Sequence, residues 1–499
     1  MAGGGLEKRV FKLTALLEIG KAMTGERNLD LLLPLIMGEV TKVMEADRST
    51  LFLVDRERNE LWSKIAQGLE VREIRVKVGT GIAGSVAAAG TVVHIPDAYA
   101  DPRFDRTTDL KTGYRTRSIL AVPMVNKPGE VIGVIQVLNK REGRFTDEDI
   151  ELLQALSSQA AVAVENALLY EEIRNLFEGF IKASAYAIES RDPTTSGHSE
   201  RVAVLTCSLA EHVDRAETGP YAAVRFTAAD LRELRFASLL HDFGKVGVRE
   251  HVLVKANKLY DQNLELVRAR FHFLRKQMEV EALERKMALL AAGRVEEVQA
   301  DLRAIDERLR EKAARLDADF QFILEANRPT ILPQGGFERI VEIASRTYVD
   351  PEGKPQPILT PREAENLSIG KGSLNAEERL EIESHVTHSF HFLRQIPWTR
   401  DLRRIPAIAY GHHEKLNGTG YPNRLTAETI PVQSKIMTVA DIYDGLTASD
   451  RPYKKALPPE RALDILQTEV KSDALDPELV RIFIESKTYL LTIPPARKP

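Results

Sequence analysis

Residues 411–422 read GHHEKLNGTGYP, in which two adjacent histidines and an acid precede a glycine-rich turn that closes on Tyr-Pro. If the pair lies on a helix, His412 and His413 point about 100° apart and would reach two different metal ions in one cleft. The glycines let the backbone approach a ligand closely, and the Tyr-Pro pair fixes the turn. Paired histidines also occur on ordinary surfaces, so a metal site requires further ligands elsewhere in the chain.

The segment ASLLHDFGKVG at 237–247 supplies such ligands, with His241, Asp242 and Lys245 following an apolar helical turn. An adjacent His-Asp pair offers one nitrogen and one oxygen ligand, and the second carboxylate oxygen can bridge to another ion. Alone, the pair is more typical of a polar contact at a helix end. The other candidates are Glu189 and His198 in 188–202, His385 and His388 in 381–393, and Asp441, Arg451 and Lys454 in 438–456. Surface or packing roles are the simpler interpretation of His212, His251, His272, His388 and His391.

The bulk composition is that of a soluble multidomain protein. A chain of 499 residues is too long for one core and predicts two or three domains. A net charge of −4 with mixed signs does not indicate a nucleic-acid-binding surface. The single cysteine, Cys207, excludes an intramolecular disulfide and a thiolate metal cluster. With no signal peptide and no apolar run of about 18 residues, a cytoplasmic location is predicted.

The first part of the chain alternates short β-type runs with helices. Apolar residues recur at helical spacing at 13–25 and 29–44, which predicts two helices. Runs rich in β-branched residues predict strands at 49–55, 74–78, 91–95, 118–125 and 129–140. A long helix without a breaker follows at about 146–190, with Thr146 as its predicted N-cap. Such a helix is either a rigid spacer or the seam of a parallel homodimer, and we favour the homodimer.

The region from about 180 onward is nearly all helix. In it, apolar residues recur three and four apart at 264–278 and, after a phase shift, at 280–290, and the spacing returns at 298–309. Two heptad runs around a short break of small residues predict an antiparallel helical hairpin over 259–330. The simplest interpretation of its charged faces is that they are exposed to solvent, and the alternative is that they bind a partner.

The motifs together resemble the HD-GYP family of metal-dependent phosphohydrolases. HD at 241–242, HHEKLNGTGYP at 412–422 and the ADIYDGLTASDRPY run stand in the family's order, and DPTTSGHSERV at 192–202 fits its approach. The resemblance covers about 175–490 apart from the hairpin, and implies an all-α helical bundle that hydrolyses cyclic di-GMP. It also implies a centre of two or three divalent ions, iron or manganese.

The resemblance assigns roles residue by residue. It makes Asp242 a bridging ligand and implies the further metal ligands Glu189, His198, His241, His385, His412, His413 and Asp441. Glu189 matches the carboxylate of three-metal members, and its presence favours three ions over two. The implied substrate-binding residues are Lys245, Arg451, Gly418, Gly420, Tyr421 and Pro422. Lys245 would also act in catalysis, by binding a phosphate oxygen or assisting the leaving group.

The hairpin is a departure from the family pattern. Segments 255–267 and 371–386 both resemble the stretch that precedes the family's next histidine, so the assignment of His385 is open between two places. His388 stands where the family has a small residue, which leaves an accessory ligand role as an alternative.

Residues 76–105 and 116–140 resemble a GAF domain, and the resemblance covers about 10–168 within a predicted domain of 1–168. It is closest to the GAF domains of cyclic-nucleotide phosphodiesterases, whose signature is matched by Asn139, Lys140, Phe145 and Asp149. Ile150 stands where the signature has a glutamate. The resemblance implies an α+β domain with an antiparallel sheet and a small-molecule ligand, for example a cyclic nucleotide. The alternative is a GAF fold that serves dimerisation only.

We therefore expect a metal-dependent phosphodiesterase that opens cyclic di-GMP to pGpG, with further cleavage to GMP as the alternative end point, under control of an N-terminal GAF sensor. A cyclic di-GMP receptor that recruits partners is one alternative. An HD phosphohydrolase for another cyclic dinucleotide is the other.

Overall fold

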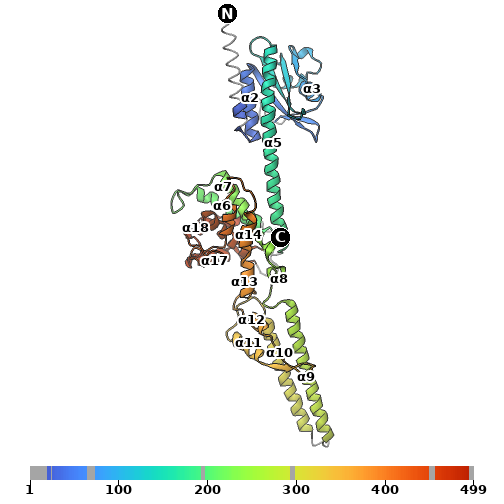
Figure 1. Ribbon diagram of the computed structural model, residues 1–499, viewed down its shortest axis with the longest axis vertical. Helices are drawn as coiled ribbons and strands as arrows, with labels where there is room; N and C mark the ends of the chain where they lie inside the picture. The colour runs from blue at the N-terminus through green and yellow to red at the C-terminus, as the bar shows by residue number, and fades with distance from the viewer. Residues whose placement is uncertain are drawn as a thin grey trace. The chain divides into compact units, whose positions relative to one another are not determined.

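The computed structural model describes residues 20–23, 25–63, 74–192, 197–292, 298–448 and 456–493. The chain divides into two compact units, residues 1–179 and residues 180–499 (Figure 1). The first is an α+β unit, as predicted, and the second is helical except for a two-stranded ribbon. Of the predicted sites, Arg451 and the neighbouring Lys454 lie outside the described residues, as does most of the helix predicted at 13–25.

The first unit is built on a six-stranded antiparallel sheet in the order β3-β2-β1-β6-β5-β4. Its strands are β1 (Ala46–Asp55), β2 (Glu60–Ser63), β3 (Ile74–Lys77), β4 (Val93–Ile95), β5 (Ile119–Val125) and β6 (Val131–Lys140). Its helices are α2 (Leu29–Val43), α3 (Gly81–Ala89), η1 (Ala98–Ala100), α4 (Thr107–Thr112) and the first part of α5 (Asp147–Glu189). All five predicted strand runs are confirmed, and β2 is the strand that the sequence reasoning missed.

The two faces of this sheet are covered by different helices. Leu51 and Leu53 of β1 point into a core shared with α2 and α5, whereas Phe52 points into a second core against α3. This alternation follows from the two-residue period of a strand. Both faces are therefore closed by apolar packing, and α5 is fixed to the domain along its first half.

The second unit begins within α5 and continues as a bundle. Its helices are α6 (His198–Asp214), α7 (Ala228–Leu240), η2 (Phe243–Gly247), α8 (Glu250–Leu253), α13 (Ala376–Glu383), α14 (His385–Leu393), α15 (Ile405–Tyr410), α16 (Val432–Thr447), α17 (Pro459–Lys471), α18 (Pro477–Glu485) and η3 (Thr488–Leu490). Helix α6 packs between α7 and α16, and α14 packs against η2 and α15. Residues on either side of a long insertion are thus brought together.

The insertion lies between α8 and α13. It consists of α9 (Asp261–Ala292), α10 (Gln299–Ala326), α11 (Gly336–Ser345), the ribbon β7 (Thr347–Val349) and β8 (Pro355–Pro357), and α12 (Pro361–Leu367). Helices α9 and α10 pack on each other as the predicted hairpin (Figure 1). Phe271 and Ile323 of the hairpin share one core with Ile343 and Leu367, so the packed insertion extends beyond residue 330.

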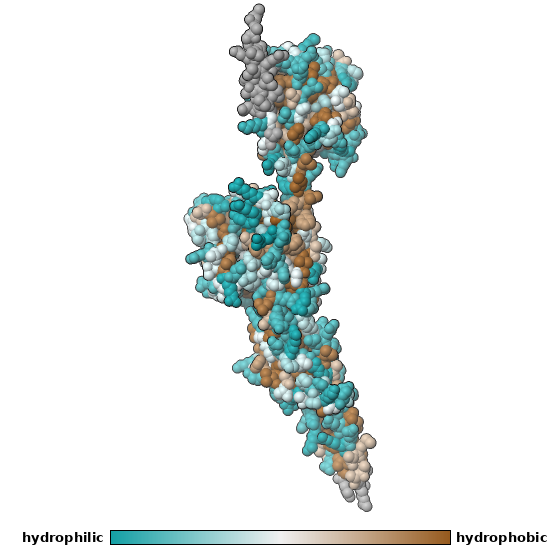
Figure 2. All heavy atoms as spheres, in the orientation of Figure 1, coloured by the Kyte–Doolittle hydropathy of each residue, from teal (hydrophilic) through white to brown (hydrophobic). Residues whose placement is uncertain are grey.

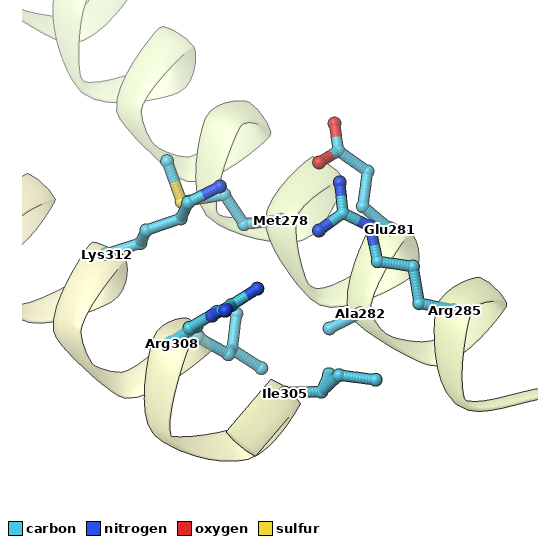
Figure 3. A pocket seen from close by; sticks show the side chains of 8 residues that line it. Met278, Glu281, Ala282, Arg285, Ile305, Arg308 and Lys312 are labelled. Atoms are coloured by element: carbon cyan, nitrogen blue, oxygen red, sulfur yellow. The ribbon is translucent and has the colours of Figure 1, made fainter. Parts of the chain in front are cut away.

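The two apolar runs of α9 behave differently. Val267, Phe271 and Leu274 of the first run are buried in the insertion core. The second run, Val280, Leu283, Met287 and Leu290, is 44–69% exposed. The second run therefore does not supply the packed face of the hairpin, where Ala282 is buried and lines a cleft with Ile305 and Leu309 of α10. Lys286 Nζ of α9 also lies 2.5 Å from Asp306 Oδ1 of α10. The cleft is small and has an apolar floor, with Arg285, Arg308 and Lys312 at its rim (Figure 3).

The two ends of the insertion are joined by a buried polar cluster. Lys255 Nζ lies 2.6 Å and 2.8 Å from the two carboxylate oxygens of Glu378, and the Tyr260 hydroxyl donates to the same carboxylate at 2.7 Å. The segments 255–267 and 371–386, which both resemble the family's approach to its next histidine, therefore meet in space. Helix α13 leads from this cluster to Ser384 and directly into α14, whose first residue is His385.

Candidate metal centre

The candidate ligands come from the ends of helices that are distant in sequence. His198 is the first residue of α6, and His385 is the first residue of α14. His241 and Asp242 join α7 to η2. His412 and His413 follow α15 in a turn, and Asp441 lies on α16. Except for the half-buried His413 and Asp441, these residues are buried, so their charges and lone pairs face one another rather than solvent.

Ligand atoms gather in three overlapping groups, in each of which they lie within 4.8 Å of one another. The groups are His385, His412 and His413; His198, His241 and Asp242; and His241, His412 and Asp441. The third group shares one member with each of the other two, so the groups form one continuous centre. His385 belongs to this centre, and His272 is exposed on α9, as expected of a surface residue.

The Asp242 carboxylate faces two groups of imidazoles with its two oxygens. Its Oδ1 lies 3.3 Å from Nε2 of His385. Its Oδ2 lies 3.6 Å from Nε2 of His241 and 3.7 Å from Nε2 of His198. A carboxylate whose oxygens point to two separate sets of nitrogen donors has the arrangement that bridges two cations.

Asp441 repeats this arrangement on the other side of the centre. Its Oδ1 lies 3.2 Å from Nε2 of His198 and 3.8 Å from Nε2 of His241, while its Oδ2 lies 3.9 Å from Nδ1 of His413. The two carboxylates therefore each extend from the His198–His241 side to the side that holds His385, His412 and His413.

Three of the histidines are oriented by backbone carbonyls. Nδ1 of His241, His385 and His412 lies 2.5–2.6 Å from a carbonyl oxygen three residues earlier. Because a carbonyl only accepts, Nδ1 carries the proton and Nε2 of a neutral ring is a bare lone pair. All three Nε2 atoms are buried without a hydrogen-bond partner, although such atoms are normally paired. Nitrogen lone pairs fixed toward carboxylates fit a metal ion, because the opposite Nδ1–H is held as in metal-ligating histidines.

The protonation states also suit cation binding. Burial lowers the pKa of His241, and burial together with neighbouring imidazoles holds the pKa of His412 well below its ordinary value. Burial lowers the pKa of His413 to about 3. Burial opposes ionisation of Asp242, but Lys245 and His241 outweigh it and hold its pKa well below the usual range. Neutral imidazoles beside ionised carboxylates are the forms that bind divalent metal.

His198 is oriented by a carboxylate instead of a carbonyl. Its Nδ1 lies 2.7 Å from Oδ2 of Asp444, one turn beyond Asp441 on α16. Arg201 in turn donates to both oxygens of Asp444, at 2.6 Å from Nε and 3.1 Å from Nη2. Burial opposes protonation of His198, but its hydrogen bonds to Asp441 and Asp444 prevail and raise its pKa to about 9. Asp444 was not among the residues singled out from the sequence, although its spacing of three from Asp441 puts both on one helix face.

Lys245 reaches the centre from η2. Its Nζ lies 2.8 Å from Oδ2 of Asp242 and 3.3 Å from Oδ2 of Asp192, which is buried and was not predicted as a site residue. Burial opposes the charge of Lys245, but Asp242 and Asp192 outweigh it and raise its pKa, so it stays an ammonium group. Lys245 thus brings a fixed positive charge to the edge of the metal centre.

Gly244 allows the HD segment to approach the helix that carries His385. An added Cβ would lie 1.9 Å from the carbonyl oxygen of His385 and 2.3 Å from the amide nitrogen of Ser389. The Ser389 hydroxyl accepts from the Gly244 amide and donates to the carbonyl of His241, both at 2.7 Å. This close contact between η2 and α14 brings Asp242 to His385 across the insertion.

The GTGYP loop packs against His413. The Tyr421 ring lies 4.8 Å from the His413 ring between centroids. Gly420 has no room for a side chain, because a Cβ would lie 2.3 Å from the amide nitrogen of Lys415. Buried Glu414, also missed by the sequence reasoning, holds the loop by accepting from the amides of Asn423 and Leu425 at 2.7 and 2.8 Å. The peptide bond between Tyr421 and Pro422 is cis, and Gly418 has a φ of 73°.

One expectation about the neighbouring residues differs from the observed geometry. His412 and His413 do not lie on a helix, because α15 ends at Tyr410 and Gly411 packs on Ser434. Their rings lie 4.1 Å apart, and both belong to the group that contains His385. The Glu189 carboxylate accepts from the amides of Gly197 and Ser199 at 2.8 and 2.7 Å, and among the described residues it joins none of the three groups. His388 is exposed and lies against Gly247.

The signature residues of the first unit join its sheet to α5. Asn139, which has a φ of 54°, accepts from the amides of Arg117 and Ser118. Lys140 Nζ lies 3.0 Å from Asp149 Oδ1, and the other Asp149 oxygen accepts from Thr146 at the start of α5. Phe145 is buried in the core on the α2–α5 face, and Ile150 packs against that core, which suits an apolar residue at this position.

Comparisons with known proteins agree with this division. A family model described as a GAF domain matches residues 28–164, and two described as HD domains match residues 195–316 and 357–479. The gap between the two HD matches falls within the insertion. The chain therefore carries a GAF domain followed by an HD domain.

Curated relatives include a probable 3',5'-cyclic phosphodiesterase of Caenorhabditis elegans, 35% identical over 30% of this chain and 22% of that protein. Another is the dual 3',5'-cyclic-AMP and -GMP phosphodiesterase 11 of Drosophila melanogaster, 36% identical over 33% of this chain and 12% of that protein. The chain spans less than a quarter of the length of either.

Among solved structures, the GAF domain of a Coxiella burnetii phosphoenolpyruvate-protein phosphotransferase is 23% identical, with a TM-score of 0.30, over 32% of this chain and 96% of that domain. A GAF domain/HD domain protein of Geobacter sulfurreducens is 19% identical, with a TM-score of 0.26, over 30% of this chain and 98% of that one. No described helix is long and apolar enough to cross a membrane.

Proposed function

We propose that the HD domain of this chain is a metal-dependent phosphodiesterase that hydrolyses cyclic di-GMP to pGpG and further to GMP, controlled by the GAF domain. The observation that carries the proposal is the pair of carboxylates, Asp242 and Asp441, each directed toward two sets of imidazoles. A buried, fully satisfied polar cluster would not leave the Nε2 atoms of His241, His385 and His412 without partners.

Two divalent ions fit this donor set best, one with His198 and His241 and one with His385, His412 and His413. Glu189, the expected ligand of a third ion, already accepts two backbone hydrogen bonds, which favours two ions over three. Nitrogen and oxygen donors without cysteine suit six-coordinate iron or manganese. Bound there, the ions would neutralise the charge of a phosphodiester and lower the pKa of water to near neutrality.

The remaining polar groups have roles that do not depend on the identity of the ions. Lys245, held between Asp242 and Asp192, is an ammonium group placed to bind a phosphate oxygen or to donate a proton to the leaving alkoxide. Tyr421 and the backbone around Gly420 border the centre beside His413 and would shape the substrate cleft. Arg451 is proposed to pair with the second phosphate of a cyclic dinucleotide.

The substrate is the part of the proposal that depends most on resemblance. The GTGYP loop favours cyclic di-GMP, whereas the named activities of the relatives concern 3',5'-cyclic mononucleotides. A direct comparison of cyclic di-GMP, cyclic AMP, cyclic GMP and another cyclic dinucleotide therefore tests it. The full chain is purified without oxygen, its metal content is measured, and products are separated by chromatography. We expect two irons or manganeses per chain and turnover of cyclic di-GMP to pGpG and GMP.

Asp242→Ala tests the site itself. Loss of a carboxylate shared by both ions should remove metal and hydrolysis together. Asp317→Ala, an exposed carboxylate on the hairpin that pairs with Arg275, is the matched control and should retain both. Turnover by Asp242→Ala with full metal content would contradict the site. Metal and tight nucleotide binding without turnover in the unmodified chain would favour the receptor alternative.

We also propose that the chain forms a parallel homodimer through α5. Val162, Leu169, Ile173, Leu176 and Phe180 follow one another at heptad spacing along α5 and are 47–76% exposed. Figure 2 shows hydrophobic surface where α5 leaves the first unit. Exposed apolar residues at that spacing are typical of a two-stranded coiled coil. Light scattering should give a dimer mass for the full chain and a monomer mass for Ile173→Glu, with Asn175→Glu, on the opposite face, remaining dimeric. An unchanged mass for Ile173→Glu would exclude this interface.

For the GAF domain, we propose a small-molecule ligand, and cyclic AMP and cyclic GMP are the first candidates because of the named activities of the relatives. Titration calorimetry of the full chain, with its metal removed so that no nucleotide is hydrolysed, tests binding. Binding that survives Asp242→Ala would indicate a site outside the metal centre. Absence of heat with both nucleotides would favour the dimerisation role.

A further inference from the structure

The histidines of the centre differ in what orients them, and the difference separates His198 from the others. His241, His385 and His412 donate their Nδ1–H groups to carbonyls within their own local segments. His198 alone is directed by a side chain from another helix, through the 2.7 Å contact between its Nδ1 and Oδ2 of Asp444. The partner of its Nδ1 is therefore a single carboxylate that lies 246 positions away in the sequence.

Asp444 is itself held in place. It is 1% exposed, and Arg201 donates to its two oxygens from Nε and Nη2. Arg201 lies one turn beyond His198 on α6, so one helix supplies both the oriented imidazole and the cation that fixes the orienting carboxylate. This closed set of contacts ties α6 to α16 beside the centre.

The geometry points to Asp444 as a positioning residue for one of the two ions. We propose that Asp444, fixed by Arg201, holds His198 as a ligand of the ion on the His241 side, so that retention of this ion depends on Asp444. The ion held by His385, His412 and His413 does not depend on it, because none of these residues contacts Asp444 in the described structure. The inference rests on the proposed two-ion centre.

A negative partner for Nδ1–H also strengthens the imidazole as a donor, because it compensates the positive charge that the ring acquires on binding a cation. Loss of such an outer partner typically weakens metal binding by roughly 10- to 100-fold. Asp444→Asn keeps an oxygen that can accept from Nδ1–H but removes the charge and the paired hydrogen bonds to Arg201. It is therefore a test of the carboxylate rather than of the space it fills.

The experiment is a titration of the metal-free full chain with Mn²⁺, followed by metal analysis and electron paramagnetic resonance. The unmodified chain should bind two ions and show the spectrum of a coupled pair. Asp444→Asn should bind one ion with unchanged affinity and the other roughly 10- to 100-fold more weakly. At equal Mn²⁺ it should then show the signal of an isolated ion. A purely structural role would not change the spectrum in this way.

Asp319→Asn is the matched control, because Asp319 is also a buried carboxylate paired with an arginine, at 2.6 Å from Nη2 of Arg346 in the insertion. It should retain two ions and the coupled spectrum. Arg201→Lys is a milder second variant that preserves Asp444 and should weaken the same ion to a smaller extent. If Asp444→Asn does not fold, Arg201→Lys decides the question by the same readouts.

Two equally tight ions in Asp444→Asn or Arg201→Lys would overturn the inference and leave the proposed function intact. Loss of both ions together from either folded variant would also overturn it, because the dependence would not be confined to one ion. An unmodified chain that binds no Mn²⁺ or iron would instead overturn the proposed function.

Discussion

Gly244→Ala should separate the two halves of the metal centre without replacing any of the proposed ligands. A Cβ at this position would lie 1.9 Å from the carbonyl oxygen of His385, whereas real Cβ atoms essentially never come closer than 3.0 Å to another heavy atom. The obstructing atoms are backbone atoms of α14, so no side chain can rotate away. Helix α14 or η2 must therefore move by about 1.1 Å, the difference between the two distances.

That movement is large compared with the tolerance of a metal site, where ligand distances hold within about 0.2 Å. The contact of 3.3 Å between Asp242 Oδ1 and His385 Nε2 would open by a similar amount. We expect loss of the ion on the His385 side and a fall in activity of at least about 100-fold, as for other misplacements of about 1 Å. Overpacking of about 1–3 kcal/mol should also lower the unfolding midpoint by roughly 5 °C.

Gly247→Ala is the matched control, because it lies on the same short helix but the atoms nearest to its Cβ belong to the side chain of His388, at 2.9 Å. An exposed imidazole can rotate away, so this variant should retain metal, activity and thermal midpoint. The assays are metal analysis, cyclic di-GMP turnover and thermal unfolding of the full chain. Full metal content and activity in Gly244→Ala would refute the role of this contact.

Three further outcomes test other parts of the domain. Glu414→Gln should loosen the GTGYP loop by weakening its contacts to two loop amides, and steady-state kinetics should show KM rising more than kcat falls; an unchanged KM would contradict this role. Replacing 279–312 by a short linker should leave folding and turnover intact, as measured by thermal unfolding and activity, because the buried core residues Leu274 and Leu316 remain; insolubility would show that the distal hairpin is required. Lys255→Met leaves the buried Glu378 carboxylate without its cationic partner and should lower the free energy of unfolding in denaturant by about 3–5 kcal/mol. A change below about 1 kcal/mol would refute the buried-pair argument.

Strongly periodic segments were predictable from the sequence. The five β-type runs of the first domain are strands, and the segment from 146 to about 190 is a single helix. Strand β2 was missed because its sequence, ELWS, lacks the β-branched residues that mark the other strand runs. The prediction of a helix at His412 and His413 is wrong, because α15 ends at Tyr410. The hairpin was predictable as a pair of helices, but not its rotation, since α9 carries two apolar stripes and only packing on α10 selects one.

In the candidate site, too, some residues were predictable from the sequence and others were not. Adjacent pairs such as His241-Asp242 are visible as motifs, because both ligands lie in one segment of the chain. Asp192, Asp444 and Glu414 were not singled out, because their function depends on contacts with residues that are remote in sequence. The two similar segments, 255–267 and 371–386, are distinguished only in space, where His385, which lies at the end of the second segment, joins the centre.

The sequence by itself determined which donor atoms this chain possesses, their order, and the helical or extended character of the segments that carry them. These properties depend on side-chain chemistry and on periods of two or 3.6 residues, which are local. Only the tertiary structure decided that Asp242 and Asp441 each face two sets of imidazoles, that three Nε2 atoms are buried without partners, and that Glu189 caps a helix. Such properties depend on the distances between segments, and packing contacts such as the one at Gly244 set those distances.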